Sequence, residues 1–190
     1  MDAPPAKPLD TAQAARFRQA LGLLQSGRHD SALVIAEALA AQAPQAADAW
    51  QLLGMCLAAN GRQQEADTAF ERALALLPGN ATVQRNYAVS LAGHGRSLLA
   101  RGRPEDAEPV LRRAVSLSPD LAYAWADLGT VLRMLGRVDD ALAAFHEARG
   151  LLDRRGADSS GVRDAISGTL ADAGRPAEAL AHARRLAAER

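Results

Sequence analysis

One pattern of Trp, Leu-Gly, Gly-Arg, Ala, Phe and Ala occurs twice in this chain with the same spacing. The first copy begins at Trp50 and the second at Trp125, and every member of the pattern matches position for position. Such self-similarity is typical of repeat architectures, in which one unit cannot bury its apolar face alone and does so against its neighbours. The chain is therefore expected to fold as short units stacked in sequence order.

The same frame extends beyond these two copies. Each unit has a small anchor residue preceded by a Gly-Arg pair, and the anchors, separated by 34, 41, 34 and 38 residues, are Ala32, Ala66, Ala107, Ala141 and Ala179. Prolines follow three of the units, and proline ends a helix because it has no N–H to donate. Aromatic residues make up only 4% of the chain, so the apolar content is mostly Ala and Leu, which favours closely packed helices.

These offsets resemble the tetratricopeptide repeat family, whose 34-residue unit carries Trp, Leu-Gly, Tyr, Ala, Phe, Ala and Pro at fixed positions. The resemblance covers residues 13–190 and implies an all-α superhelix, a right-handed solenoid of antiparallel helix hairpins. We expect a disordered tail at 1–12, followed by units at 13–46, 47–80, 81–121, 122–159 and 160–190. Within a unit, Gly54 should face Ala66 across the hairpin, and Phe70 should fill the junction between helices.

Two units depart from the 34-residue length. The third has seven extra residues, which two turns of an elongated helix would accommodate, whereas Gly93-His94-Gly95 could instead mark a break and a protruding loop. We favour the long or kinked helix. Its neighbourhood is rich in arginine, which we interpret as a solvated edge in preference to an anion site: Arg96, Arg101, Arg103, Arg112 and Arg113. The fourth unit has four extra residues within 153–161, whose Gly/Ser/Asp composition predicts a flexible connection. Pro109 should kink the second helix of the third unit or lie in its first turn.

Nothing in the sequence indicates catalytic chemistry. The single cysteine, Cys56, lies in an apolar helical stretch and is interpreted as a buried structural thiol. The four histidines occupy unrelated positions of the frame, and none forms a metal-binding pair. We therefore predict that the chain is not an enzyme and binds no cofactor or metal.

The charge balance restricts the partners. A formal net charge of zero argues against general nucleic-acid or anionic-membrane binding, because both depend on accumulated positive charge. No signal peptide or membrane-spanning stretch is recognisable, so a cytoplasmic, bacterial-type protein is expected. The predicted partner is a protein or peptide.

The resemblance also implies where such a partner binds. In the family, ligands lie on the concave face formed by the first helix of each hairpin, and the matching positions here are Gln51, Met55, Arg85, Asn86, Val89, Tyr123, Asp127, Thr130, Arg133 and Asp164. A carboxylate clamp of the co-chaperone type is not expected, because its positions hold Phe17, Leu21 and Leu52.

Three functions compete at this point. The leading hypothesis is an adaptor that binds a peptide or a helix in its groove. The alternative is an N-terminal, substrate-recruiting arm of a larger bacterial enzyme such as a sulfotransferase, glycosyltransferase or oxygenase. The last helix lacks the polar cap that ends most arrays and carries Leu180, Ala183 and Leu186 on one face, so a homodimer through this helix is a third possibility.

Overall fold

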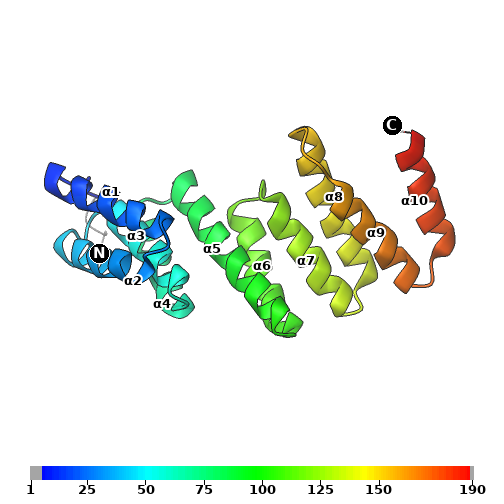
Figure 1. Cartoon of the computed structure of the whole chain (residues 1–190), viewed down its shortest axis with the longest axis horizontal. Coiled ribbons are helices and arrows are strands. Elements are labelled where there is room, and N and C mark those ends of the chain that lie inside the picture. Colours follow the sequence, from blue (N-terminus) through cyan, green and yellow to red (C-terminus); the bar gives the residue numbers. More distant parts are fainter. Residues whose placement is uncertain (1–5, 189–190) are drawn as a thin grey trace. The chain divides into compact units, whose positions relative to one another are not determined.

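The computed structural model describes residues 6–188, except for the side chains of residues 182, 183 and 185–188. Within these residues the regular structure consists of ten α-helices and contains no strand (Figure 1). They are α1 (Thr11–Gln25), α2 (His29–Gln42), α3 (Ala47–Ala59), α4 (Gln63–Leu76), α5 (Ala81–Ala100), α6 (Pro104–Leu117), α7 (Ala122–Met134), α8 (Val138–Arg154), α9 (Ser160–Asp172) and α10 (Pro176–Ala188). The predicted all-α class is confirmed.

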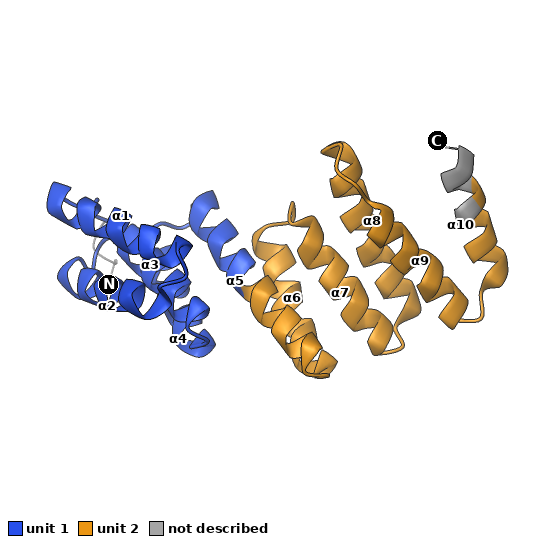
Figure 2. Ribbon diagram, viewed as in Figure 1, with its two compact units in different colours: residues 1–90 blue, residues 91–190 orange. Residues whose placement is uncertain are grey.

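Helices pack in sequence order as antiparallel hairpins. The chain forms two compact units, one ending at Ser90 and the other beginning at Leu91, so that the division falls inside α5 (Figure 2). In unit 1, α1 packs on α2, α2 on α3 and α3 on α4. In unit 2 the same succession continues from α6 through α10, and the first helices α7 and α9 also contact each other. Each unit therefore has the neighbour-to-neighbour packing of a helical repeat protein.

The Gly-Arg pairs form the turn inside every hairpin. Their glycines have φ between 67° and 75°, a conformation that costs other residues energy because Cβ approaches the following carbonyl. They are Gly27, Gly61, Gly102, Gly136 and Gly174. In each turn the arginine N–H donates to a leucine carbonyl five residues earlier, as Arg137 does to Leu132 at 2.9 Å. This is the Schellman helix ending, and it explains why glycine recurs at this point of the frame.

A glycine in the first helix lets the second helix approach closely. A Cβ built on Gly54 would lie 2.8 Å from the ring of Phe70, and one built on Gly129 would lie 2.7 Å from the ring of Phe145. Both rings are buried. The nearest neighbour of Gly54 is thus the phenylalanine ring, rather than Ala66 as expected from sequence.

The third hairpin repeats this contact with other residues. A Cβ on Gly95 would lie 2.6 Å from Leu111 Cγ, and the separation of 16 residues is the same as in the other two pairs. Gly95 therefore occupies the position of Gly54, and the seven extra residues lie before it. They extend α5 to 20 residues without a break, which confirms the long helix and excludes the protruding loop.

The first half of α5 belongs to the packing of unit 1. Tyr87 is fully buried and stacks on Phe70, with ring centroids 4.8 Å apart. One turn earlier, Val83 joins an apolar cluster with Ala73 and Leu76 of α4. The extra two turns of α5 are consequently used as core in unit 1, while Gly95 packs on α6 in unit 2.

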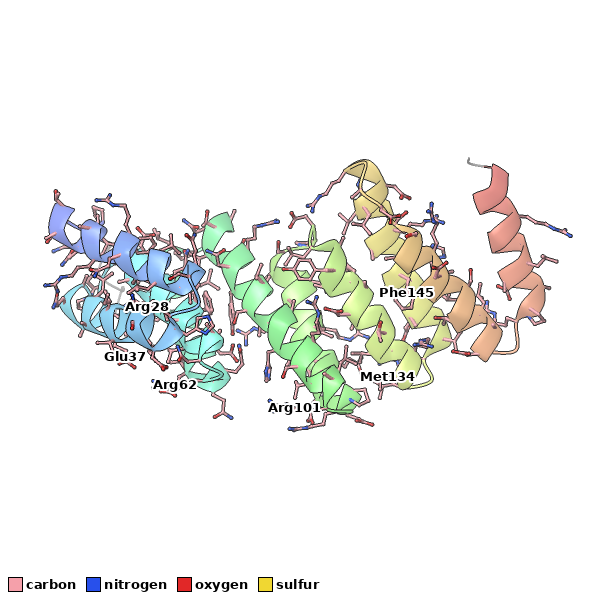
Figure 3. All side chains as sticks on the ribbon, viewed as in Figure 1. Arg28, Glu37, Arg62, Arg101, Met134 and Phe145 are labelled. Carbon is pink, nitrogen blue, oxygen red and sulfur yellow. The ribbon has the colours of Figure 1, made fainter. Side chains whose placement is uncertain are left out.

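The arginine of the turn also ties three of the hairpins to the one before it. Arg62 binds Glu37 of α2 at 3.1 Å as well as Glu65 in its own hairpin, and Figure 3 labels the first two side chains. In unit 2, Arg137 contacts Glu108 of α6 and Arg175 contacts Asp139 of α8, each at 2.6 Å. These arginines are partly exposed, so solvent screens each pair and its contribution to stability is small.

The two predicted irregularities lie within and after continuous helices. The helix α6 runs through Pro109 from Pro104 to Leu117, with Pro104 in its first turn, where the missing N–H has no helical partner in any case. The helix α8 extends to Arg154, and the following connection is held by hydrogen bonds from Ser159 to Asp153 and from Ser160 to Asp158. The connection that composition predicts to be flexible thus contains local polar contacts.

The N-terminal end of the chain differs from expectation, whereas the C-terminal helix is described only in part. The helix α1 begins at Thr11, inside the predicted tail of 1–12, because Asp10 and Gln13 form a capping box. Residues 1–5 lie outside the described part of the chain. In α10, Leu180 is exposed, but the side chains of Ala183 and Leu186 also lie outside the described residues.

Candidate functional site

Four of the predicted site residues lie on one side of α7. Tyr123, Asp127, Thr130 and Arg133 follow one another at intervals of four, three and three residues, which places them on a single helix face. Tyr123 is 40% exposed and Arg133 is also exposed, whereas Asp127 and Thr130 are half-buried. The Thr130 hydroxyl donates to the Ala126 carbonyl inside the helix at 3.0 Å.

The strongest polar contact on this face comes from Arg96 of α5, which the family positions read from the sequence missed. Its guanidinium binds Asp127 Oδ2 through Nη2 at 2.8 Å and through Nε at 3.2 Å. The Arg96 Cζ atom also lies 5.6 Å from the centroid of the Tyr123 ring, within the range of a cation–π contact. Arg96 remains 58% exposed, so this trio presents an oriented, accessible cation.

Register explains why the prediction missed Arg96. Counted from the start of α5, the residue that matches Met55 is Val89; counted from Gly95, the true equivalent of Gly54, it is Arg96. The two differ by the seven inserted residues. The sequence does contain the correct register: the anchor Ala107 follows Gly95 at the same distance as Ala66 follows Gly54.

Burial raises the pKa of Asp127 above its ordinary value of 3.8, and the hydrogen bond and charge of Arg96 offset only part of that effect. The ionised carboxylate is therefore held in a site that penalises its charge. The positive charge of Arg96 compensates part of the cost of burying the Asp127 carboxylate. This attraction favours the orientation in which the two side chains meet between α5 and α7.

A second ion pair lies further along α7. Arg133 Nη1 binds Asp172 of α9 at 2.9 Å, next to a hollow of about 280 Å³. The hollow is also lined by Met134, which is 50% exposed and is labelled in Figure 3, and by Val138 and Thr169. An exposed Met beside a salt bridge offers an adaptable apolar contact. The remaining predicted residue of unit 2, Asp164 of α9, is exposed.

The other five predicted residues belong to unit 1. Gln51 is only 7% exposed, so it contributes little surface, and Met55 is half-buried. In the first half of α5, Arg85 is exposed, Val89 is 45% exposed and Asn86 is half-buried. The intervals of the last three residues place them on one side of the helix.

The described residues contain no cluster of three or more His, Cys, Asp or Glu side chains that could hold a metal ion. Cys56 is fully buried, as predicted, and burial raises the pKa of its thiol to about 11. Nucleophilic thiols have a lowered pKa instead, so Cys56 is a packing residue. Between residues 6 and 188, no helix combines the length and apolar character that crossing a membrane requires.

Helix pairs of one design, each joined by a glycine turn and packed neighbour to neighbour, define a helical-repeat scaffold. Models of the tetratricopeptide repeat match residues 17–91, 93–159 and 169–185. The chain belongs to the tetratricopeptide repeat family, and its fold is that of a protein-interaction scaffold. No curated protein matches it by sequence.

Solved structures share the fold at low sequence identity. A MamA structure from strain AMB-1 is 24% identical, with 93% of this chain and 90% of that chain covered and a TM-score of 0.64. MamA from Desulfovibrio magneticus RS-1 is 19% identical, with 93% of each chain covered and the same TM-score. PilF from Pseudomonas aeruginosa is 24% identical, covering 90% of this chain and 73% of that one, with a TM-score of 0.61. At these identities the likeness extends to the fold alone.

Proposed function

We propose that this chain is an adaptor that binds a peptide or a helix of another protein on the first-helix faces of its hairpins. The observation that carries the proposal is the face of unit 2 on which Arg96 is stacked on Tyr123 and paired with Asp127. Arginine and aromatic side chains that are exposed yet held in place are the groups that contribute most to protein interfaces.

The two ion pairs on this face support recognition of a polar partner. Arg96 and Arg133 each contact a carboxylate from a neighbouring helix, at 2.8 and 2.9 Å. Their orientation is therefore set before a partner arrives, which reduces the conformational entropy that binding has to overcome. Met134 next to Arg133 adds an apolar contact that can adapt to different side chains. In unit 1, Arg85 and Val89 supply a smaller surface of the same mixed kind.

The test is comparative capture with matched variants. The tagged full chain would be compared with a variant that combines Arg96→Ala, Tyr123→Ala and Arg133→Ala, and the captured proteins would be quantified by mass spectrometry. A control variant carries Glu147→Ala, which removes an exposed side chain from a second helix, α8. Circular dichroism checks that all three are folded.

We expect the triple variant to lose at least tenfold of its specific partners while the control retains them. A second variant, Arg85→Ala with Val89→Ala, measures the contribution of unit 1. Equal capture by the wild-type chain, the triple variant and the unit 1 variant would refute the proposal, because the first-helix faces would then contribute nothing to binding. Dimerisation through α10 stays a prediction, which light scattering of the full chain would check.

A further inference from the structure

An extended segment lies against unit 1 ahead of its first helix. The Lys7 backbone N–H donates to the Gln45 carbonyl at 2.8 Å, in the loop that joins α2 and α3. Ala6 packs against the apolar cluster of Ala47, Ala73, Leu76 and Val83, at the junction of α3, α4 and α5. Two independent contacts, one polar and one apolar, thus hold residues that precede the repeat frame altogether.

The local sequence favours this extended conformation. Pro8 cannot enter a helix interior, and a residue that precedes proline is restricted to the extended region. Lys7 is in that position. Asp10, the last residue before α1, is also extended, with φ −71° and ψ 175°. The segment 6–9 therefore loses little conformational freedom when it docks.

An aromatic side chain borders the docking point. Trp50 packs against the same apolar cluster as Ala6, and its indole is held by a hydrogen bond from Nε1 to the Pro44 carbonyl at 3.0 Å. The apolar cluster that receives Ala6 thus also carries a fixed indole, and aromatic side chains line the grooves in which proteins bind extended, proline-containing peptides. The Gln45 carbonyl, which accepts the hydrogen bond from Lys7, belongs to the residue that follows Pro44.

Unit 2 contains the same docking point with a different occupant. Trp125 Nε1 donates to the Pro119 carbonyl at 2.9 Å, matching Trp50 and Pro44 at a separation of 75 residues. The carbonyl that corresponds to Gln45 is that of Asp120, and it accepts a hydrogen bond from Arg155 Nη2 at 3.0 Å. Arg155 is available there because α8 extends to Arg154. The acceptor is thus engaged in both units, by a side chain from within the array in unit 2 and by the preceding segment in unit 1.

We infer that unit 1 carries a peptide-docking site beside Trp50 that takes an extended, proline-containing segment, and that residues 6–9 are its occupant within this chain. The Gln45 carbonyl binds the backbone N–H of the residue before proline, and the cluster around Ala47 receives a small side chain one position earlier. This site is separate from the first-helix faces, and its test does not depend on them.

The indole N–H resonances of Trp50 and Trp125 provide the readout, since they are the only two tryptophans of the chain. In the full chain, Lys7→Pro removes the donated N–H, and Ala6→Asp places a charge in the apolar cluster. We expect both substitutions to shift the Trp50 indole resonance and to leave that of Trp125 unchanged. Lys7→Ala, which keeps the N–H, is the matched control and should leave both resonances in place.

A synthetic peptide of residues 1–10 then tests docking from solution. Added to the Lys7→Pro chain, the peptide should return the Trp50 resonance toward its wild-type position. The peptide concentration needed for this should be at least tenfold lower than the concentration that changes the Trp50 resonance of the wild-type chain. The linked segment competes in the wild type at a high effective concentration. The inference is overturned if Lys7→Pro and Ala6→Asp leave the Trp50 resonance unchanged, or if the peptide acts equally on both chains.

Discussion

Two glycines in α5, Gly93 and Gly95, should respond to alanine in opposite directions. A Cβ on Gly93 meets no atom within 4 Å, so Gly93→Ala changes only the backbone entropy of a helical position. Alanine is favoured over glycine in a helix by about 1 kcal/mol, so this substitution should stabilise unit 2 by roughly 0.5–1 kcal/mol. The helix and the substitution are the same at Gly95, and only the neighbours differ.

A Cβ on Gly95 lies 2.6 Å from Leu111 Cγ, 2.8 Å from Cδ2 and 3.2 Å from Cδ1. Carbon atoms in contact are normally about 3.5–4.0 Å apart, so Leu111 would have to move by about 1 Å. Leu111 is fully buried, and its Cγ cannot swing away as a chain end could. Overpacking of this kind costs about 1–3 kcal/mol, and the helix preference returns about 1 kcal/mol of it. Gly95→Ala should therefore destabilise unit 2 by up to about 2 kcal/mol.

Urea denaturation followed by circular dichroism measures both variants, and the two free energies of unfolding should differ by about 1–3 kcal/mol, the cost of the overpacking alone. A Leu111→Ala background supplies the control, because removing the leucine atoms removes the clash. In that background Gly95→Ala should become stabilising, as Gly93→Ala is, and the pair should show a coupling energy in a double-mutant cycle. If Gly95→Ala and Gly93→Ala stabilise the wild-type chain equally, the register that pairs Gly95 with Leu111 is wrong.

Three further predictions concern ionisation, reactivity and turn geometry. Burial opposes ionisation of Glu108, but its hydrogen bonds to Arg112 and Arg137 outweigh this and lower its pKa. Glu108→Gln should therefore lower the free energy of unfolding by about 1 kcal/mol at pH 7. In thermal melts this loss should disappear as pH falls from the unfolded-state pKa of about 4.3 through the lower folded-state pKa. A stability difference that stays constant across this pH range would contradict the prediction. The Cys56 thiol, with a pKa of about 11, should react with Ellman's reagent at pH 8 only on unfolding, and fast labelling of the folded chain would show that it is accessible. Gly136 has φ 74°, so Gly136→Ala should lower stability by about 1–2 kcal/mol in urea titrations, whereas an unchanged midpoint would show that the turn relaxes.

The sequence predicts the helices and their turns well because these depend on local rules. The Gly-Arg pairs mark five turns that all have the same hydrogen bonds, since only glycine adopts the positive φ without strain. Likewise, Gly54 with Phe70 and Gly129 with Phe145 pack as two copies of one contact. Repetition within the chain supplies a comparison that a single sequence normally lacks.

The candidate site is harder to locate from the sequence because its residues depend on register within an irregular unit. Counting from the start of α5 gives Arg85 and Val89, whereas packing gives Arg96, and the choice between them rests on the contact between Gly95 and Leu111. For the segment 6–9 the sequence predicts a disordered tail, because its composition is typical of disorder. Its contacts with Gln45 and Ala47 join residues about 40 positions apart, which no local pattern indicates.

The length of α5 has a consequence for how such arrays can vary. Seven residues advance a helix by about 10 Å and turn it by only about 20° less than two full turns, so the packed side stays almost where it was. An addition of five residues would instead rotate that side by about 140°, and Gly95 would no longer meet Leu111. Tolerated length changes within a first helix should therefore come in steps near seven or eleven residues. Insertions of other lengths would turn the packed side of the helix away from its neighbour.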